Sequence, residues 1–157
     1  MNLAKTMYKN QIMKKVRLLG VLLLAIFIVI SCKPNQNLNV NDQNIHRKWM
    51  LVEYKDFTKQ ELTNLGANMD LTKNSDAPNR YTAKMGCNGM FFTAEFNQGK
   101  AKFSGVGSTM MYCDGRMKLE ELFGKDLTLM NRYKIEGHFL TLTDGTTSMK
   151  FIAADWD

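Results

Sequence analysis

Apolar and polar residues alternate with a period of two along most of the chain after residue 80. Within residues 80–85, Tyr81, Ala83 and Met85 lie on one side of this alternation, and polar residues lie on the other. Successive side chains of a β-strand point to opposite faces, whereas a helix repeats about every 3.6 residues. The pattern therefore predicts a domain built from strands with one buried face.

The same alternation predicts the other strands. Residues 90–96 and 101–103 form a predicted hairpin around the turn Asn97-Gln98-Gly99, since these residue types tolerate tight turns. Further strands are expected at residues 49–54, 69–73, 133–135, 140–142 and 149–153. The first two of these are separated by a polar loop with a poorer signal. The strands after residue 130 form a predicted meander, because short turns containing glycine join them.

One segment has a helical period instead. Leu119, Phe123 and Leu127 recur four positions apart, and Glu121 and Lys125 pair on the opposite side. This predicts one amphipathic helix whose apolar stripe faces the core, because a lone helix on a β domain must cover the sheet. The predicted fold class is therefore mainly β (α+β), with an antiparallel sheet and one amphipathic helix.

The N-terminal segment has the layout of a signal peptide. Lys14, Lys15 and Arg17 precede an apolar run of 13 residues, from 18 to 30. A helix that spans a membrane needs about 20 such residues, so a permanent transmembrane helix is the weaker interpretation. Residues 1–31 are therefore predicted to be an export signal that is removed.

The apolar run ends in Ile30-Ser31-Cys32, which resembles a lipobox. A thiol can be alkylated by lipid, and a small residue before it gives a peptidase access to the bond. We expect lipid on Cys32 to hold the protein to a membrane of the cell envelope, with the domain in the periplasm or at the cell surface. Lys33 stands where an aspartate would indicate inner-membrane retention, which favours the outer membrane. Residues 32–45 are a predicted tether, and residues 46–157 are the predicted domain.

The formal net charge of +6 has its source in the predicted signal peptide. Residues 1–31 hold five of the 21 basic residues and no acidic one, which leaves 16 basic against 15 acidic residues in the remainder. A nucleic-acid binder needs a basic surface on its folded part. The near-neutral remainder therefore argues against a nucleic-acid partner.

If Cys32 carries lipid, Cys87 and Cys113 remain as a pair in a compartment that permits disulfides. A bridge between them would stabilise the fold by about 3 to 4 kcal/mol in the chain-entropy model. The alternative is two buried free thiols, since spacing alone does not show that the side chains meet.

Around these two cysteines the sequence resembles the META domain family, which the HslJ heat-shock lipoprotein typifies. The residues that carry the resemblance are Gly86, Cys87, Asn88, Thr109, Met111 and Cys113. Glu120, Phe123 and Leu127 fit the helix of such domains, and Trp49 fits the tryptophan that opens them; the likeness covers residues 46–154. The chain departs from the family pattern at Met110, where an arginine is usual, and near Phe92, where a glycine is usual.

The resemblance implies a small, partly open, β-barrel-like antiparallel sheet with one helix, similar to the cracked barrels of secretin pilot lipoproteins. Members of the family are envelope proteins linked to stress or antibiotic tolerance, without an established enzymatic activity. The resemblance therefore implies a fold and a location more than a function.

The residues are compatible with three candidate functions to different degrees. The first is a noncatalytic envelope lipoprotein that binds an envelope protein or a hydrophobic ligand in a cleft of the barrel, without a cofactor. An enzyme is disfavoured because His46 and His138 are the only histidines and no nucleotide-binding or metalloprotease motif occurs.

The alternative function is Cu(I) binding, because soft sulfur ligands suit that ion. The sulfur-bearing residues form two groups in sequence: Met85, Cys87 and Met90, then Met110, Met111, Cys113 and Met117. Core packing explains the same residues equally well.

Overall fold

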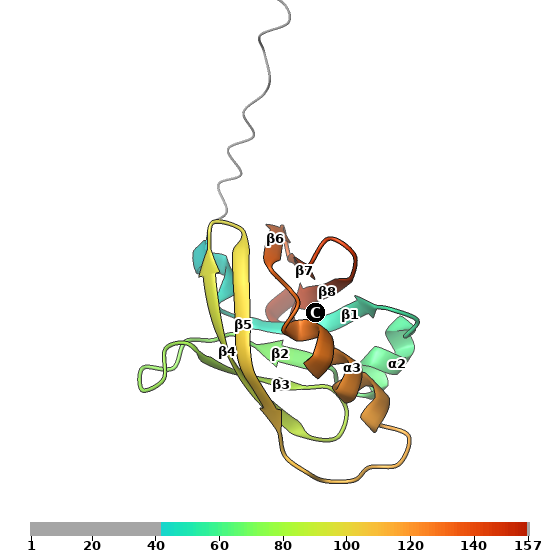
Figure 1. The fold of residues 1–157 in the computed structure, drawn as a ribbon. Helices are drawn as coiled ribbons and strands as arrows, with labels where there is room; N and C mark the ends of the chain where they lie inside the picture. Colours follow the sequence, from blue (N-terminus) through green and yellow to red (C-terminus); the bar gives the residue numbers. More distant parts are fainter. Residues whose placement is uncertain (1–41, 157) are drawn as a thin grey trace, which may run out of the picture. The chain divides into compact units, whose positions relative to one another are not determined.

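The computed structural model describes residues 42–156, so the predicted signal peptide, Cys32 and most of the predicted tether lie outside the described residues. Eight antiparallel strands form a closed barrel in which each strand pairs with the next and β8 pairs with β1 (Figure 1). The strands are β1 (Lys48–Tyr54), β2 (Asn68–Asp70), β3 (Arg80–Lys84), β4 (Gly89–Asn97), β5 (Lys100–Ser108), β6 (Arg132–Glu136), β7 (Phe139–Thr143) and β8 (Ser148–Ala153).

In the described part of the chain, four helical segments accompany the barrel: η1 (Asp42–Ile45), α2 (Lys59–Asn64), α3 (Met117–Leu127) and η2 (Ala154–Trp156). Within residues 42–156, none of them is long and apolar enough to cross a membrane. The mainly β fold with one main helix, α3, confirms the predicted fold class.

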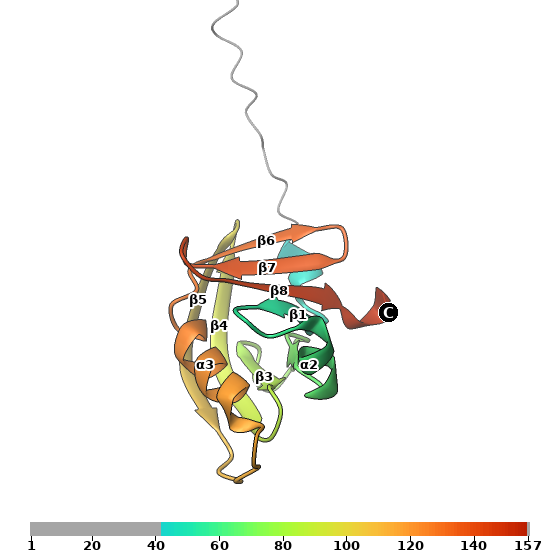
Figure 2. The ribbon, with the colours of Figure 1, turned by 90° about the vertical axis from the view of Figure 1, so that its right-hand side faces the viewer.

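The barrel closes most weakly between β5 and β6. These strands share one aligned pair, Lys100 with Arg132, whereas β4 and β5 pair along most of their length. The chain between them forms α3, which lies next to the far end of β5 in two perpendicular views (Figures 1 and 2). The barrel is thus closed, and the opening that the family resemblance implies is reduced to the gap where β5 and β6 diverge.

Side chains fill the interior of the barrel. Phe92 and Phe103 point inward from β4 and β5, and both are buried. Trp49 and Phe151, from β1 and β8, are fully buried in the same core cluster, which α3 completes with Phe123. Among the described residues, the members of this cluster run from Ile45 to Ala153, so the core draws on both ends of the described range.

Two features differ from the sequence-based expectations. The stretch between β1 and β2 contains α2, and its start is a capping box in which Thr58 and Glu61 bond each other's backbone N–H groups. The pattern Thr-x-x-Glu was a usable signal for this helix. At the N-terminal end, Ile45 is fully buried and its carbonyl accepts a 2.9 Å hydrogen bond from the indole of Trp49, so the fold includes residues assigned above to the tether.

Candidate functional site

A disulfide joins Cys87, which follows β3, to Cys113, which precedes α3. Their Cα atoms lie 5.9 Å apart, within the usual range for a bridge. The bridge fastens the 109–116 loop, which is the segment between β5 and α3, to the turn between β3 and β4. The predicted disulfide is confirmed, and the alternative of two free thiols is wrong.

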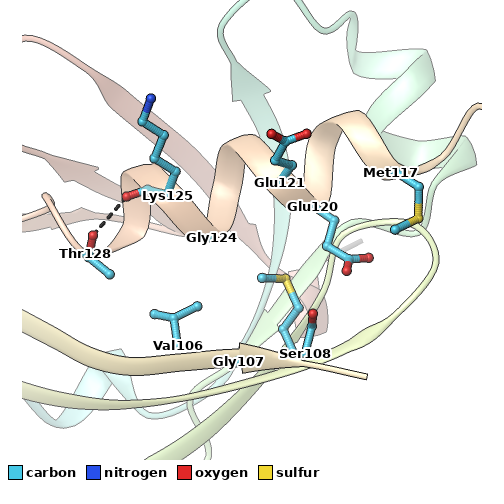
Figure 3. A pocket seen from close by; sticks show the side chains of 10 residues that line it. Val106, Gly107, Ser108, Met117, Glu120, Glu121, Gly124, Lys125 and Thr128 are labelled. Carbon is cyan, nitrogen blue, oxygen red and sulfur yellow. Dashed lines mark hydrogen bonds between the residues drawn. The ribbon is translucent and has the colours of Figure 1, made fainter. Parts of the chain in front are cut away.

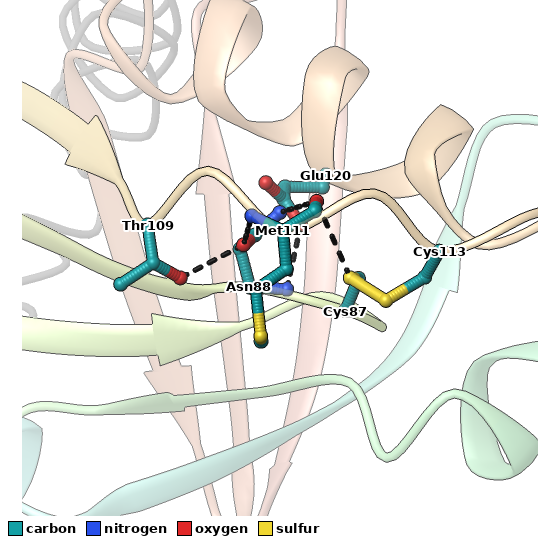
Figure 4. The surroundings of a disulfide bond; sticks show 6 residues. All are labelled: Cys87, Asn88, Thr109, Met111, Cys113 and Glu120. Carbon is teal, nitrogen blue, oxygen red and sulfur yellow. Dashed lines mark hydrogen bonds between the residues drawn. A yellow bond between two sulfur atoms is a disulfide. The ribbon is translucent and has the colours of Figure 1, made fainter.

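Asn88 organises the same loop from beneath (Figure 4). Its side chain is buried, and its Oδ1 accepts hydrogen bonds from the Thr109 hydroxyl and the Met111 N–H, both at 2.8 Å. Its Nδ2 donates to the Met111 carbonyl at 3.1 Å, and its own N–H donates to the Glu120 carboxylate at 2.9 Å. The buried side-chain amide of Asn88 thus bonds both the N–H and the carbonyl of Met111, as the backbone of a neighbouring strand would.

Gly86 must be a glycine for a steric reason. Its φ is +127°, a conformation that L side chains rarely adopt, and a Cβ there would lie 2.8 Å from the carbonyl oxygen of Arg116. The turn before the disulfide therefore packs backbone against backbone. Together, the bridge, Asn88 and Gly86 explain structurally every residue that carried the family resemblance except the exposed side chain of Met111.

The 109–116 loop displays three large apolar side chains to solvent. The exposed fraction is 99% for Met110, 56% for Met111 and 83% for Tyr112. The loop is nevertheless held in one conformation by the disulfide and by the hydrogen bonds to Asn88. A fixed, exposed group of methionine and aromatic side chains is typical of an interaction surface rather than of a core.

Beside this loop, a groove of about 520 Å³ separates the end of β5 from α3 (Figure 3). We call it the α3–β5 groove. The lining residues are Met90, Val106, Gly107, Ser108, Met117, Glu120, Glu121, Gly124, Lys125 and Thr128. The side chains of Val106, Ser108 and Glu120 point into the space between strand and helix, whereas those of Glu121 and Lys125 point away from it.

Glu120 is the charged group that faces this groove. Its exposed fraction is 6%, and its carboxylate accepts one hydrogen bond, from the N–H of Asn88. None of the ion pairs within residues 42–156 includes it. A buried carboxylate without a cation is costly, so a positive group brought into the groove would be stabilised.

The sulfur-bearing residues do not assemble as the copper alternative requires. The disulfide takes up the sulfur atoms of both Cys87 and Cys113, which removes the two thiolates from the ligand set. Met85 and Met90 are buried in the core, while the side chain of Met110 points into solvent. Within residues 42–156, no group of three or more His, Cys, Asp or Glu side chains is arranged to hold a metal ion.

The two histidines have separate surroundings. His138 stacks on Trp156 with the ring centroids 3.3 Å apart, and His46 Nδ1 lies 3.3 Å from the Leu71 carbonyl. Neither side chain lines the α3–β5 groove.

Sequence reasoning missed a buried polar network at the other end of α3. Asp126 accepts a hydrogen bond from the Tyr54 hydroxyl and pairs with Lys55 at 2.6 Å. Burial acts to raise the pKa of Asp126, but the hydrogen bonds from Lys55 and Tyr54 outweigh it and hold that pKa below its usual range. No local pattern marks this carboxylate, because its partners lie far away in sequence.

Known proteins share the sequence pattern and the fold of this chain. The META domain family matches residues 42–156. An NMR structure of a protein from Burkholderia xenovorans superposes with a TM-score of 0.59 at 16% identity, over 73% of this chain and 87% of that one. A crystal structure of a DUF4847 family protein from Bacteroides vulgatus gives a TM-score of 0.47 at 14% identity, over 68% and 92%. None of the curated proteins matches the chain. The likeness to the Burkholderia protein supports the fold, and the match over the whole of residues 42–156 shows that the chain belongs to the META domain family.

Proposed function

We propose that this chain is a noncatalytic lipoprotein of the cell envelope that docks onto another envelope protein through the 109–116 loop. The observation that carries the proposal is the exposure of Met110, Met111 and Tyr112 on a loop that is fixed in place. Methionine, tyrosine and arginine are enriched in the cores of protein interfaces, and Arg116 is an exposed residue of this loop.

A rigid loop suits binding because little conformational entropy is lost when a partner covers it. The hydrogen bonds from Asn88 and the bridge to Cys87 order the backbone before any partner arrives. A hydrophobic ligand inside the barrel has less support, since Phe92, Phe103 and their neighbours occupy that space. The filled barrel therefore favours contacts on the surface.

The lipid on Cys32 is the second part of the proposal. It would keep the domain at a membrane, with the outer membrane favoured, and thereby raise the local concentration of an envelope partner. A role in envelope stress or tolerance is the physiological setting we infer from the family resemblance. Metabolic labelling with an alkyne fatty acid should mark the wild-type chain and leave Cys32→Ser unmarked; equal labelling of both would contradict the anchor.

Photo-cross-linking in cells tests the docking surface. A photoreactive amino acid in place of Tyr112 should give one discrete protein adduct, and the same group in place of exposed Thr146, in the turn between β7 and β8, should not. Adding Met110→Ser to the Tyr112 probe should remove the adduct. Adducts of equal yield from both positions, or binding of the purified domain to phospholipid vesicles through the loop, would overturn protein docking.

A further inference from the structure

Among residues 42–156, the edge of β5 that faces α3 has no strand partner beyond Lys100. Ala101 donates its N–H to Asn131 on the β6 side, and Thr109 donates its N–H to Gly89 on the β4 side. A bulge at Gly105, whose φ is +61°, shifts the register between these two points. By the alternation of an antiparallel strand, the N–H and C=O groups of Val106 and Ser108 then point away from β4.

These backbone groups open onto the α3–β5 groove. Within residues 42–156, neither Val106 nor Ser108 makes a backbone hydrogen bond on the side away from β4. Both residues line the groove, and α3 forms its opposite wall (Figure 3). A free strand edge next to a helix is the geometry in which several peptide-binding domains add an extended peptide to their sheet.

We propose that the α3–β5 groove binds an extended peptide segment of a partner protein, which adds a strand to the free edge of β5 and places a basic side chain on Glu120. The inference rests on the proposed docking role but concerns a different surface from the 109–116 loop. It names the partner's chemistry: a strand in which a lysine or arginine and a small apolar residue occupy alternate positions.

The groove itself selects these side chains. Glu120 is buried, forms no ion pair with any residue in the range 42–156 and faces the Ser108 end of the groove, so a positive charge would be stabilised there. Further along, the end of Met90 and the side chain of Val106 pack close to Gly124, at 3.2 and 3.8 Å from the position of an added Cβ, and the apolar lining beside them suits a small aliphatic side chain. Side chains two positions apart on a strand share a face, so one peptide satisfies both places.

An NMR titration tests the strand addition. The probe is an acetylated eight-residue peptide in which every second residue is threonine and the residues between are lysine, valine or isoleucine. It is added to a protein that begins at residue 32 and carries Cys32→Ser. The amides of Val106 and Ser108 should become protected from hydrogen exchange. The amide of Thr109, already bonded to Gly89, serves as the internal control and should not change. The same peptide with N-methyl groups on its β5-facing nitrogens should bind at least tenfold more weakly.

Two substitutions test the side-chain contacts. Gly124→Leu should abolish binding while the thermal midpoint is kept, since the first added carbon would lie 3.2 Å from the flexible end of Met90 and in ordinary contact with Val106 at 3.8 Å, and leucine favours the helix. Gly124→Ala is the matched control and should retain binding. Glu120→Gln still accepts the hydrogen bond from Asn88, and it should weaken the lysine peptide about tenfold while leaving a glutamine version of that peptide unchanged.

The outcomes separate this proposal from the docking role of the loop. A folded chain carrying Met110→Ser and Tyr112→Ser should bind the peptide as the wild type does. If the peptide protects neither Val106 nor Ser108, if the N-methylated peptide binds equally well, or if folded Gly124→Leu binds unchanged, strand addition is wrong. Cross-linking through Tyr112 would be unaffected by any of these results.

Discussion

The hydroxyl of Tyr54 donates a 2.8 Å hydrogen bond to the carboxylate of Asp126, which joins the end of β1 to the last turn of α3 across 72 residues. A carboxylate at the C-terminal end of a helix is unfavourable by itself, because the helix dipole is negative there. Lys55, which pairs with the same carboxylate at 2.6 Å, offsets this cost.

We expect Asp126→Asn to lower the free energy of unfolding by about 1–3 kcal/mol at pH 7. The folded-state pKa of Asp126 lies below its unfolded value, so its contribution is present above about pH 4 and is lost as the pH falls through the folded-state pKa. Urea denaturation at pH 7 and pH 2.5 should therefore show a difference between wild type and variant that shrinks in acid. Exposed Asp76→Asn is the control; a difference of the same size at both pH values would contradict the charge argument.

Replacing both Cys87 and Cys113 with alanine should lower the free energy of unfolding by about 3–4 kcal/mol, because the unfolded chain regains the entropy of a loop spanning 26 residues. Denaturation with and without reductant measures this. Reductant should destabilise the wild type and leave the variant unchanged. A variant as stable as the oxidised wild type would mean that the bridge contributes little.

Asn88→Asp should loosen the 109–116 loop while the barrel stays folded. The substitution sets a carboxylate oxygen against the carbonyl oxygen of Met111, where Nδ2 now donates at 3.1 Å, and it adds a negative charge near Glu120. We expect a loss of about 2–4 kcal/mol. Hydrogen exchange should show faster exchange at the Met111 amide and little change within β7 and β8. Unchanged protection at Met111 would argue against Asn88 as the organiser of the loop.

Gly86→Ala and Gly115→Ala form a matched pair. Both glycines have positive φ, but a Cβ at Gly86 meets the Arg116 carbonyl oxygen at 2.8 Å, whereas a Cβ at Gly115 meets no atom within 4 Å. Gly115→Ala should cost about 1 kcal/mol from backbone strain alone. Gly86→Ala should cost at least twice as much, because a backbone atom must also move. Equal midpoints in urea denaturation would contradict the steric role of Gly86.

Much of the candidate site was readable in the sequence because its parts are local. Gly86, Cys87 and Asn88 lie together in one turn, and the two cysteines formed a pair once Cys32 was assigned to lipid. The burial of Glu120 and Asp126 could not be predicted from the sequence. Each lies on a helix among ordinary polar residues, and the groups that bond them come from segments 32 and 72 residues away.

The alternation of apolar and polar residues predicted most of the strands and the buried side of each, because the period of two is a property of neighbouring residues. How the strands close into a barrel is seen only in the folded chain. In the folded chain, β5 and β6 meet at one aligned pair, and α3 borders the edge of β5 beyond it. Both features depend on backbone hydrogen bonds between segments that are distant in sequence. Side-chain periodicity carries no information on which strand edges are paired, so the groove exists only in the folded chain.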